Sequence, residues 1–367
     1  MIFLDYNATT KVAPAVLDKM VEAYKFPLNN SSSHQLGRHA TKLVEDARAA
    51  VKNLFNAENY EVIFTGSSTE ATNTVMFGVD VKKIIFCTIE HSSVYECRPA
   101  GKEIIEINAL ENGLIDLDDL KNKLPDGGNF LVSLMLANNE TGAIQPVEEV
   151  SKLVHQKGGL FHCDVVQAAG KIAVDLEKIN ADFASVSAHK INGPQGVGAL
   201  LIRKGLDIKP LIYGGKQEKS KRAGTTNVAG ISGFGEACKL AAQKISAYEN
   251  VKKLRDELEN EIKKIAGDDV FIFSTNVARL PNTSYIATKC REAKTQLINF
   301  DLNNICVSAG PACSSGTSTE SRILKAMGIK PEFSTSAVRV SLSVDTAKDE
   351  LEKFTKVWKE FYERTKK

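Results

Sequence analysis

The chain has 367 residues, of which 43% are hydrophobic and 25% charged, and its formal net charge is +2. This composition is typical of a globular protein, and the interspersed charges favour neither nucleic acid nor a membrane surface as a partner. The seven cysteines form no Cys-x-x-Cys pair, which argues against a disulfide framework or a structural zinc site in so long a chain. There is no bilayer-length apolar run, and a charge at Asp5 interrupts any signal-peptide core, so we expect a cytoplasmic protein.

Strand-like and helix-like segments alternate between residues 60 and 205. We expect strands at residues 61–65, 83–88, 103–107, 130–137, 159–163, 183–187 and 197–203, and helices at 69–77, 116–123 and 147–155. Several of these strands are apolar throughout, which indicates burial on both faces. The order predicts an α/β fold with a mostly parallel sheet covered by helices.

The pattern changes after residue 228. We expect one long helix at 228–265, then strands at 270–273, 282–287, 305–308 and 337–342, and helices at 292–300, 320–327 and 347–362. These shorter elements predict a smaller α+β domain. Because the chain is longer than one core usually supports, we expect a large domain at 13–250 and a small domain formed by 1–12 and 251–367.

The first segment that could carry chemistry is Thr65-Gly66-Ser67-Ser68-Thr69-Glu70, which links a strand to a helix. Ser67 and Glu70 fit a capping box, and Ser68 and Thr69 add two hydroxyls at the helix start. The free N–H groups and the helix dipole there favour an anion such as phosphate. An ordinary capped helix would explain the same residues.

Polar groups also follow later strands. His91 comes after one strand and could cover a flat cofactor and move protons, or it could simply be a solvated loop histidine. The run Asn138-Asn139-Glu140-Thr141-Gly142 follows another strand, where it could form a turn or bind a ligand through its amides. Asp164 ends the strand at 159–163, and a carboxylate there could hold a ring nitrogen cationic or cap a helix.

Lys190 is the most informative residue, because Ser187-Ala188-His189-Lys190 ends an apolar strand and Gly193-Pro194 follows. An amine where a buried strand stops is a candidate for a Schiff base with a carbonyl cofactor. A loop lysine beside a turn is the other interpretation.

Two further residues lie in the predicted small domain. Cys313 is surrounded by small residues and glycines, which indicates an accessible thiol and a candidate nucleophile. Arg339 lies inside a strand with apolar neighbours, where a guanidinium usually faces a carboxylate. That carboxylate could belong to the protein or to an amino-acid substrate.

Taken together, these motifs resemble the NifS/IscS type of cysteine desulfurase in the class V aminotransferase-like group. The likeness runs through nearly the whole chain in the same order. It includes Leu4-Asp5-Tyr6-Asn7-Ala8-Thr9-Thr10, the stretches 29–37 and 65–73, Glu90-His91, 138–142, His162-x-Asp164-x-x-Gln167, 187–194, 222–225 and Gly310-x-Ala312-Cys313. Departures from the family pattern are Asn30, Lys216, Ala223 and Pro311.

The resemblance implies a fold-type I enzyme that uses pyridoxal 5'-phosphate to convert L-cysteine to L-alanine. Lys190 would carry the cofactor, Asp164 would pair with its ring nitrogen, Gln167 would bond its ring hydroxyl and His91 would stack on the ring. The implied phosphate contacts are Ser68, Thr69, Ser187, His189 and, from a second subunit of a homodimer, Thr225. Asn139 would contact the cofactor and, with Arg339, bind the substrate carboxylate.

Cys313 would accept the sulfur as a persulfide and pass it to an acceptor such as an iron–sulfur scaffold protein, for iron–sulfur cluster, cofactor or tRNA synthesis. No metal site is implied, although Cys313 could transiently ligate an iron–sulfur cluster. The alternatives are a selenocysteine lyase or cysteine-sulfinate desulfinase, a class V aminotransferase, or a non-catalytic sulfur carrier or assembly partner. Many scaffold-coupled members have a longer C-terminal extension than this sequence, which weakens the expectation that an iron–sulfur scaffold protein is the acceptor.

Overall fold

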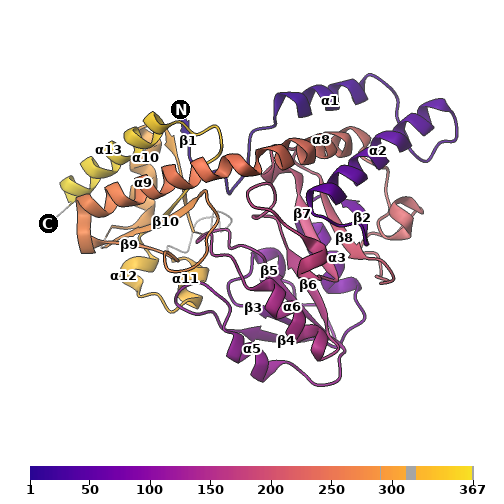
Figure 1. Cartoon of the computed structure of the whole chain (residues 1–367), viewed down its shortest axis with the longest axis horizontal. Coiled ribbons are helices and arrows are strands. Elements are labelled where there is room, and N and C mark those ends of the chain that lie inside the picture. The colour runs from indigo at the N-terminus through magenta and orange to yellow at the C-terminus, as the bar shows by residue number, and fades with distance from the viewer. Residues whose placement is uncertain (290, 311–319, 366–367) are drawn as a thin grey trace.

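The computed structural model describes residues 1–289, 291–310 and 320–365. Its larger part is built on a seven-stranded sheet with the order β2-β8-β7-β6-β5-β3-β4 (Figure 1). The strands are β2 (Tyr60–Thr65), β3 (Lys83–Cys87), β4 (Glu103–Ile107), β5 (Phe130–Met135), β6 (Leu160–Asp164), β7 (Phe183–Ser187) and β8 (Gly198–Arg203). β8 runs antiparallel to both of its neighbours and the other pairs are parallel, so the expected mostly parallel sheet is confirmed.

Both faces of this sheet are buried, as the continuous apolar strands predict. Every residue of β5 and of β7 is buried. Alternate side chains of the strands therefore enter two different cores. On β8, Leu200 and Ile202 pack with α3 (Ser68–Gly78), whereas Ala199 and Leu201 belong to the core on the opposite face.

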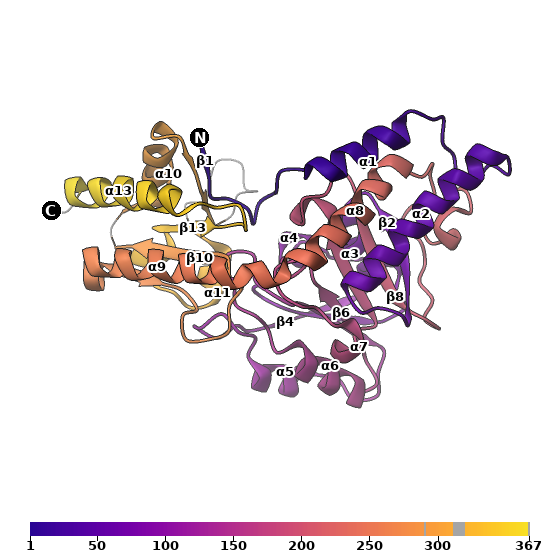
Figure 2. The ribbon, with the colours of Figure 1, turned by 45° about the horizontal axis from the view of Figure 1, so that its top comes forward.

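Helices cover the two faces (Figure 2). α3 and α4 (Ser92–Tyr95) share one core with the sheet, and the larger core on the other face includes residues of α2, α6, α7 and α8. α8 packs against both α1 and α2. The remaining bounds are α1 (Pro14–Tyr24), α2 (Gln35–Leu54), α5 (Leu117–Lys123), α6 (Val147–Gln156), α7 (Leu176–Ile179) and α8 (Val228–Lys244).

The second part of the chain has its own core. Its four-stranded antiparallel sheet has the order β12-β13-β10-β9, with β9 (Val270–Ile272), β10 (Thr283–Thr288), β12 (Ser308–Ala309) and β13 (Ala337–Ser341). β1 (Ile2–Phe3) pairs in parallel with β11 (Ile305–Cys306) beside it. The helices are α9 (Tyr248–Ala266), α10 (Ala293–Leu302), α11 (Arg322–Ala326), α12 (Pro331–Ser334) and α13 (Lys348–Thr365).

Two element predictions are wrong. The expected single helix at 228–265 is broken into α8 and α9 by a 3₁₀ turn at Ile245–Ala247. The break allows α8 to pack on α1 and α2 while α9 packs on α13, in a separate core. The expected strand at 305–308 is split between β11 and β12, which lie in different sheets. We propose the division near residues 12 and 250 because the second core begins with residues on either side of them, although Phe273, Leu280 and residues of α11 pack with the larger core.

The N-terminal segment connects the two parts. After β1 it forms a bridge between Asp5 and Ser341 of β13. It then crosses to the larger part, where Thr10 N donates to His189 O across 3.0 Å and Ala13 N donates to Asn192 O across 3.0 Å. This crossing places residues 7–9 beside the carboxyl ends of the parallel strands, where ligands bind in α/β sheets.

Candidate active site

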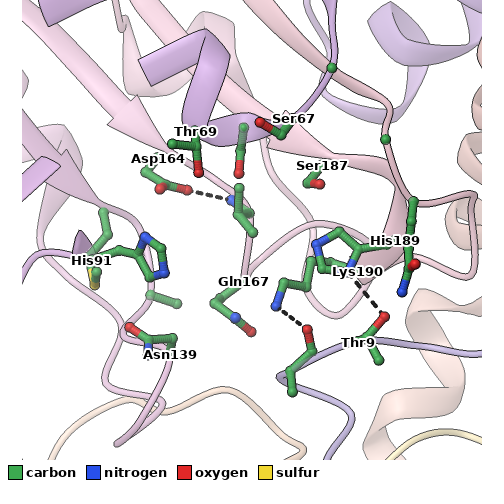
Figure 3. Close-up of a pocket in the computed structure, with 18 residues that line it drawn as sticks. Thr9, Ser67, Thr69, His91, Asn139, Asp164, Gln167, Ser187, His189 and Lys190 are labelled. Carbon is green, nitrogen blue, oxygen red and sulfur yellow. Dashed lines mark hydrogen bonds between the residues drawn. The ribbon is translucent and has the colours of Figure 1, made fainter. Parts of the chain in front are cut away.

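A cavity of about 400 Å³ lies at the carboxyl ends of β5, β6 and β7 and at the start of α3 (Figure 3). Nine of the residues singled out from the sequence line it, although they come from five separate stretches of the chain. They are Ser68, Thr69, His91, Asn139, Asp164, Gln167, Ser187, His189 and Lys190, and the other lining residues are Ala8, Thr9, Gly66, Ser67, Met135, Ala137, Val166, Gln195 and Gly196.

Lys190 lies in the 3₁₀ turn Ala188–Lys190 that follows β7. Its Nζ atom donates to the main-chain oxygens of Asn7 and Ala8, each across 2.6 Å. The turn requires a glycine, because a Cβ on Gly193 would lie 2.7 Å from Ala188 O. The local sequence therefore holds the amine just beyond the end of the buried strand β7, against the N-terminal segment.

The start of α3 forms one wall of the cavity. Ser67 caps the helix, with its Oγ accepting from Glu70 N across 3.1 Å, and Glu70 Oε2 accepts from Gly66 N across 2.7 Å. The predicted cap is confirmed, although Glu70 reaches Gly66 rather than the capping residue. Arg222 holds Glu70 across 2.9 Å. The helix N-terminus faces the cavity and favours an anion there.

Gly198, in β8, allows that strand to pack closely against the start of α3. A Cβ at that position would lie 2.6 Å from the main-chain carbon of Ser67 and 2.9 Å from Ser68 N. β8 therefore packs directly on the turn that begins α3, which keeps its N–H groups in place.

Asp164 is a buried carboxyl group at the end of β6. Burial raises its pKa to about 6, while the N–H of Val166, which donates to Oδ1 across 2.9 Å, and the charge of Lys190 oppose this rise. Burial disfavours the charged carboxylate, so a cationic ligand group beside Asp164 would stabilise its ionised form.

The two histidines of the cavity are neutral at physiological pH. Burial and the positive charges of Lys190 and Arg322 lower the pKa of His91 to about 4, and burial with Lys190 lowers that of His189 to about 4. His91 Nδ1 accepts from Ser93 N across 3.1 Å, which leaves the ring proton of the neutral imidazole on Nε2.

Asn139 is held by the turn that follows β5. Asn138 Oδ1 accepts from the N–H groups of Glu140 and Thr141, across 2.9 and 3.0 Å, and this turn directs Asn139 into the cavity. Asn139 Oδ1 is buried and lacks a hydrogen-bond partner among the described residues. Such an orphaned acceptor is costly unless a ligand supplies a donor.

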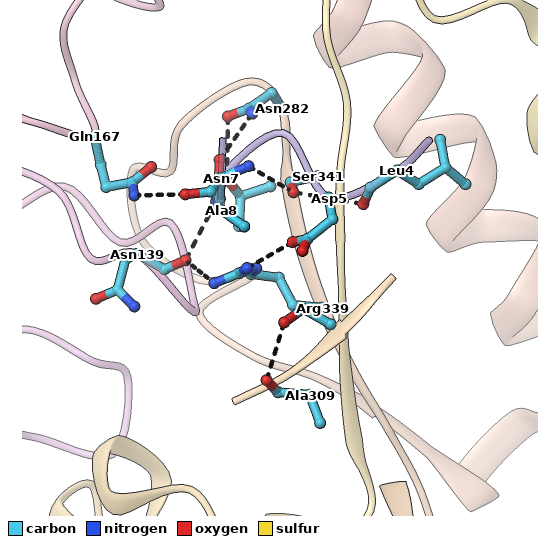
Figure 4. A network of polar contacts seen from close by, with 12 residues as sticks. Leu4, Asp5, Asn7, Ala8, Asn139, Gln167, Asn282, Ala309, Arg339 and Ser341 are labelled. Atoms are coloured by element: carbon cyan, nitrogen blue, oxygen red, sulfur yellow. Dashed lines mark hydrogen bonds and ion pairs between the residues drawn. The ribbon is translucent and has the colours of Figure 1, made fainter. Parts of the chain in front are cut away.

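Arg339 does not line the cavity, but it contacts the main chain of Asn139, which does (Figure 4). Its Nη2 donates to Asp5 Oδ1 across 2.6 Å and its Nη1 to Asn139 O across 3.0 Å. A protein carboxylate therefore faces this guanidinium, which is one of the two possibilities left open by the sequence. Arg339 Nε is buried without a partner in the part of the chain that the structure describes.

Of the predicted residues that the structure describes, Arg339 and Thr225 do not line the cavity. Thr225 is exposed in the segment before α8 and does not line it. Cys313 lies outside the described residues. The residues on either side of residues 311–319 meet at Glu140, where Ser321 Oγ donates to Glu140 Oε2 across 2.6 Å and a Cβ on Gly310 would lie 2.9 Å from the same oxygen. Glu140 directly follows Asn139, which lines the cavity, so Gly310 and Ser321 both lie near the cavity.

Several buried residues around the cavity went unassigned. Glu140 and Asn7 lie inside motifs that the sequence analysis matched, but their roles depend on contacts with distant residues. Lys171 follows Gln167 by four residues, and its side chain is buried. The sequence pattern gives no indication of this burial. Glu90 is fully buried, and burial holds the pKa of its carboxyl group well above the usual value.

In the described part of the chain, no helix is both long and apolar enough to cross a bilayer. The same residues contain no cluster of His, Cys, Asp and Glu that could hold a metal ion. The five described cysteines, Cys87, Cys97, Cys163, Cys238 and Cys306, are free thiols.

Comparison with known proteins places this site in a family. The profile of the aminotransferase class-V family matches residues 2–354. The chain belongs to this family. Among relatives of this class V chain, "Cysteine desulfurase IscS" of Dictyoglomus turgidum is 38% identical over 362 residues, covering 95% of this chain and 91% of that protein. "Cysteine desulfurase" of a Nostoc species is 36% identical over 376 residues, covering 99% and 93%.

A solved structure titled as a NifS-like protein from Rickettsia africae superposes on this class V chain with a TM-score of 0.93, 38% identity and 99% coverage of both chains. The family and fold expected from the sequence are therefore confirmed.

Proposed function

We propose that this class V protein is a pyridoxal-phosphate-dependent cysteine desulfurase, which converts L-cysteine to L-alanine and transfers the sulfur to Cys313. The observation that carries the proposal is that Lys190, Asp164 and the N-terminus of α3 line a single cavity. The relatives named cysteine desulfurase, 36–38% identical over nearly the full length, support the reaction.

The residues of the cavity fit pyridoxal phosphate. The α3 N-terminus suits its phosphate, with Ser68, Thr69, Ser187 and His189 around it. Asp164 suits a protonated ring nitrogen, and Lys190 supplies the amine that its aldehyde requires. The cofactor would supply an electron sink for the bonds around the substrate α-carbon.

The protein side chains have separate tasks. Lys190 would hold the cofactor, and its amine would move the proton at the substrate α-carbon. Asp164 keeps the ring nitrogen protonated, since a buried anion gains by pairing with a cation. His91 covers the ring as a neutral imidazole, because its pKa of about 4 keeps it uncharged. Gln167 offers an N–H to the ring hydroxyl.

The substrate carboxylate would bind to Asn139 and Arg339. Arg339 is already paired with Asp5, so the substrate would have to use its unpartnered Nε or share the guanidinium with Asp5. A guanidinium has five N–H donors in a planar fork, which permits such sharing.

The sulfur transfer balances without an added oxidant. The thiolate of Cys313 forms a bond with the substrate sulfur as the substrate carbon–sulfur bond breaks. The carbon retains the electron pair and is protonated, which gives L-alanine and a persulfide on the enzyme. An acceptor, such as an iron–sulfur scaffold protein in the cytoplasm, would then take the sulfur.

A homodimer completes the proposal. Thr225 is exposed and does not line its own cavity, as expected of a residue that serves the partner subunit. Exposed apolar side chains that a partner could cover include Leu17, Val21, Tyr24 and residues 211–213. Mixing Lys190→Ala chains with Thr225→Ala chains should restore activity, because one site of the mixed dimer then has both residues.

The turnover of L-cysteine tests the function. Wild-type protein loaded with pyridoxal phosphate, given cysteine and a reductant, should release alanine and sulfide in equal amounts. Lys190→Ala should release neither product, and Cys313→Ser should lose both. Full activity of Cys313→Ser would favour a lyase that does not use the thiol. A protein that takes up no cofactor would contradict the proposal.

A further inference from the structure

Lys171 is a buried lysine that the proposed reaction does not use. It lies on the turn after β6, and only 3% of its surface is exposed. Lysine is almost never buried so completely unless its amine is paired. Within residues 1–289, 291–310 and 320–365, no carboxylate forms an ion pair with it. Its Nζ atom instead donates to Gln167 Oε1 across 3.0 Å and to Asn7 Oδ1 across 3.1 Å.

The amide of Asn7 is completely satisfied. Its Oδ1 accepts from Lys171 and from Asn282 Nδ2 across 3.0 Å, while its Nδ2 donates to Asn139 O across 3.3 Å and to Thr283 Oγ1 across 2.9 Å. Two acceptances and two donations use the full capacity of a side-chain amide. Asn7 is therefore held in one orientation, and Figure 4 shows it at the centre of the network.

The amide of Gln167 is oriented by the same lysine. A lysine amine in this position donates to Oε1, so the NH₂ group must point the other way. One of its N–H groups donates to Asn7 O across 3.1 Å, and the other is left for the cavity that Gln167 lines. The main-chain oxygen of Asn7 also receives the Lys190 amine, so both functional side chains meet at this residue.

We propose that Lys171 is a positioning residue, which fixes the Gln167 amide with an N–H toward the cavity and holds Asn7 under the amine of Lys190. The inference rests on the proposed function, because the N–H would be directed at the ring hydroxyl of pyridoxal phosphate. A free Gln167 amide could rotate and present its C=O to the same oxygen, which would repel it.

The charges around the two lysines support this assignment. Burial, followed by the charges of Lys190 and Arg339, holds the pKa of Lys171 well below its usual value. The amine donates to both amide oxygens that it contacts. The charge of Lys190 also acts to lower the pKa of Asp164, His91 and His189.

The test uses full-length protein and pyridoxal phosphate as the probe. Two quantities are measured, the dissociation constant of the cofactor and the pH at which the absorbance of the loaded protein reports loss of the proton on the Lys190 nitrogen. The variants are Lys171→Met, Gln167→Leu and the double variant. Lys152→Met removes an exposed lysine of α6 and is the matched control.

Lys171→Met should raise the pH midpoint by about one unit, because the ring oxygen loses the oriented N–H of Gln167. It should weaken cofactor binding about tenfold, the size expected for one hydrogen bond to a charged group. The double variant should match Gln167→Leu, because a residue that acts through Gln167 has no effect without it. Lys152→Met should match the wild type.

Wild-type values in Lys171→Met, or effects that add in the double variant, would overturn the inference while the proposed function stands. A wild type that binds no cofactor would instead overturn the proposed function, and the inference with it. If Lys171→Met does not fold, Lys171→Gln keeps one donor and should give a smaller shift in the same direction. A Lys171→Gln protein indistinguishable from wild type in both measurements would also overturn the inference.

Discussion

Asp5 and Arg339 form a partly buried ion pair, with Oδ1 and Nη2 2.6 Å apart. The same guanidinium donates to the main-chain oxygen of Asn139, whose side chain lines the cavity. Arg339 thus joins β13 of the smaller part, the N-terminal segment and the turn after β5. Any substrate carboxylate that it binds must be accommodated beside Asp5.

Replacing Arg339 tests whether it serves the substrate or only Asp5. Lys keeps the charge but cannot make two parallel hydrogen bonds, so Arg339→Lys should raise KM for cysteine about 10-fold to 100-fold, as expected for one lost charged hydrogen bond. The absorbance of the loaded protein should stay unchanged. An unchanged KM with a lowered melting temperature would mean that Arg339 only pairs with Asp5.

Asp164 should lower the stability of the cofactor-free protein. Its folded pKa of about 6 exceeds the ordinary value, so the unfolded carboxyl group loses its proton first as the pH rises above 4. The native state therefore loses stability between about pH 4 and pH 6, by about 2–3 kcal/mol. Cofactor-free Asp164→Asn should be more stable than wild type by that amount at pH 7.5 and nearly equal to it near pH 4.

Urea unfolding at both pH values measures this difference, and Glu111→Gln, at an exposed position, is the control. A stability difference between Asp164→Asn and wild type that is independent of pH would contradict the account. The loaded variant should show the opposite functional result, with much weaker activity, because no anion then faces the ring nitrogen.

Arg322 should control the protonation of His91. Its guanidinium donates to the main-chain oxygens of Thr88 and Glu90, lies 3.9 Å from the centre of the Tyr95 ring, and contributes to the lowered pKa of His91. Arg322→Met should raise that pKa by about one unit, because one repelling charge is lost.

Nuclear magnetic resonance of labelled histidine in the cofactor-free protein measures the His91 pKa, with His91→Gln to assign the signal. Arg98→Met is a matched control, since Arg98 also packs over Tyr95, at 5.2 Å, but is absent from the causes of the His91 shift. Equal effects of the two variants would argue that the ring packing, and not the charge of Arg322, sets this pKa.

Gly310 should separate cofactor binding from sulfur transfer. A Cβ there would lie 2.6 Å from Tyr285 Oη, 2.8 Å from Ser321 Cβ and 2.9 Å from Glu140 Oε2, so Gly310→Ala must displace the chain that leads to Cys313. We expect an unchanged cofactor absorbance and a sulfide yield reduced about tenfold or more, the cost of misplacing a reacting group.

Ser321→Ala removes the hydrogen bond to Glu140 without adding bulk and should have a smaller effect on sulfide. Loss of cofactor from Gly310→Ala would show instead that this region supports the whole cavity.

The sequence predicted the sheet well because its strands are buried on both faces. The observed bounds of β4 and β7 are the predicted ones, and Asp164 and Lys190 lie at strand ends as expected. Each of these features can be predicted from the local sequence, because a buried apolar strand ends at the point where polar residues begin.

Features that depend on distant partners could not be predicted. Arg339 was expected to face a carboxylate, but the sequence could not identify Asp5, which precedes it by 334 positions. The break between α8 and α9 was missed because Ile245–Ala247 has no proline or glycine, and the break is set by the two cores that the helices join. The role of Lys171 could not be predicted because one of its two partners, Asn7, comes from the distant N-terminal segment.

The most direct test of the account is a single turnover without reductant. Protein loaded with pyridoxal phosphate is mixed with L-cysteine labelled with heavy sulfur, quenched and digested, and its peptides are analysed by mass spectrometry. The account predicts that the peptide containing Cys313 gains one heavy sulfur atom for each alanine released, and that Lys190→Ala gains none. Alanine released while the label appears only as free sulfide, with the Cys313 peptide unmodified, would contradict it.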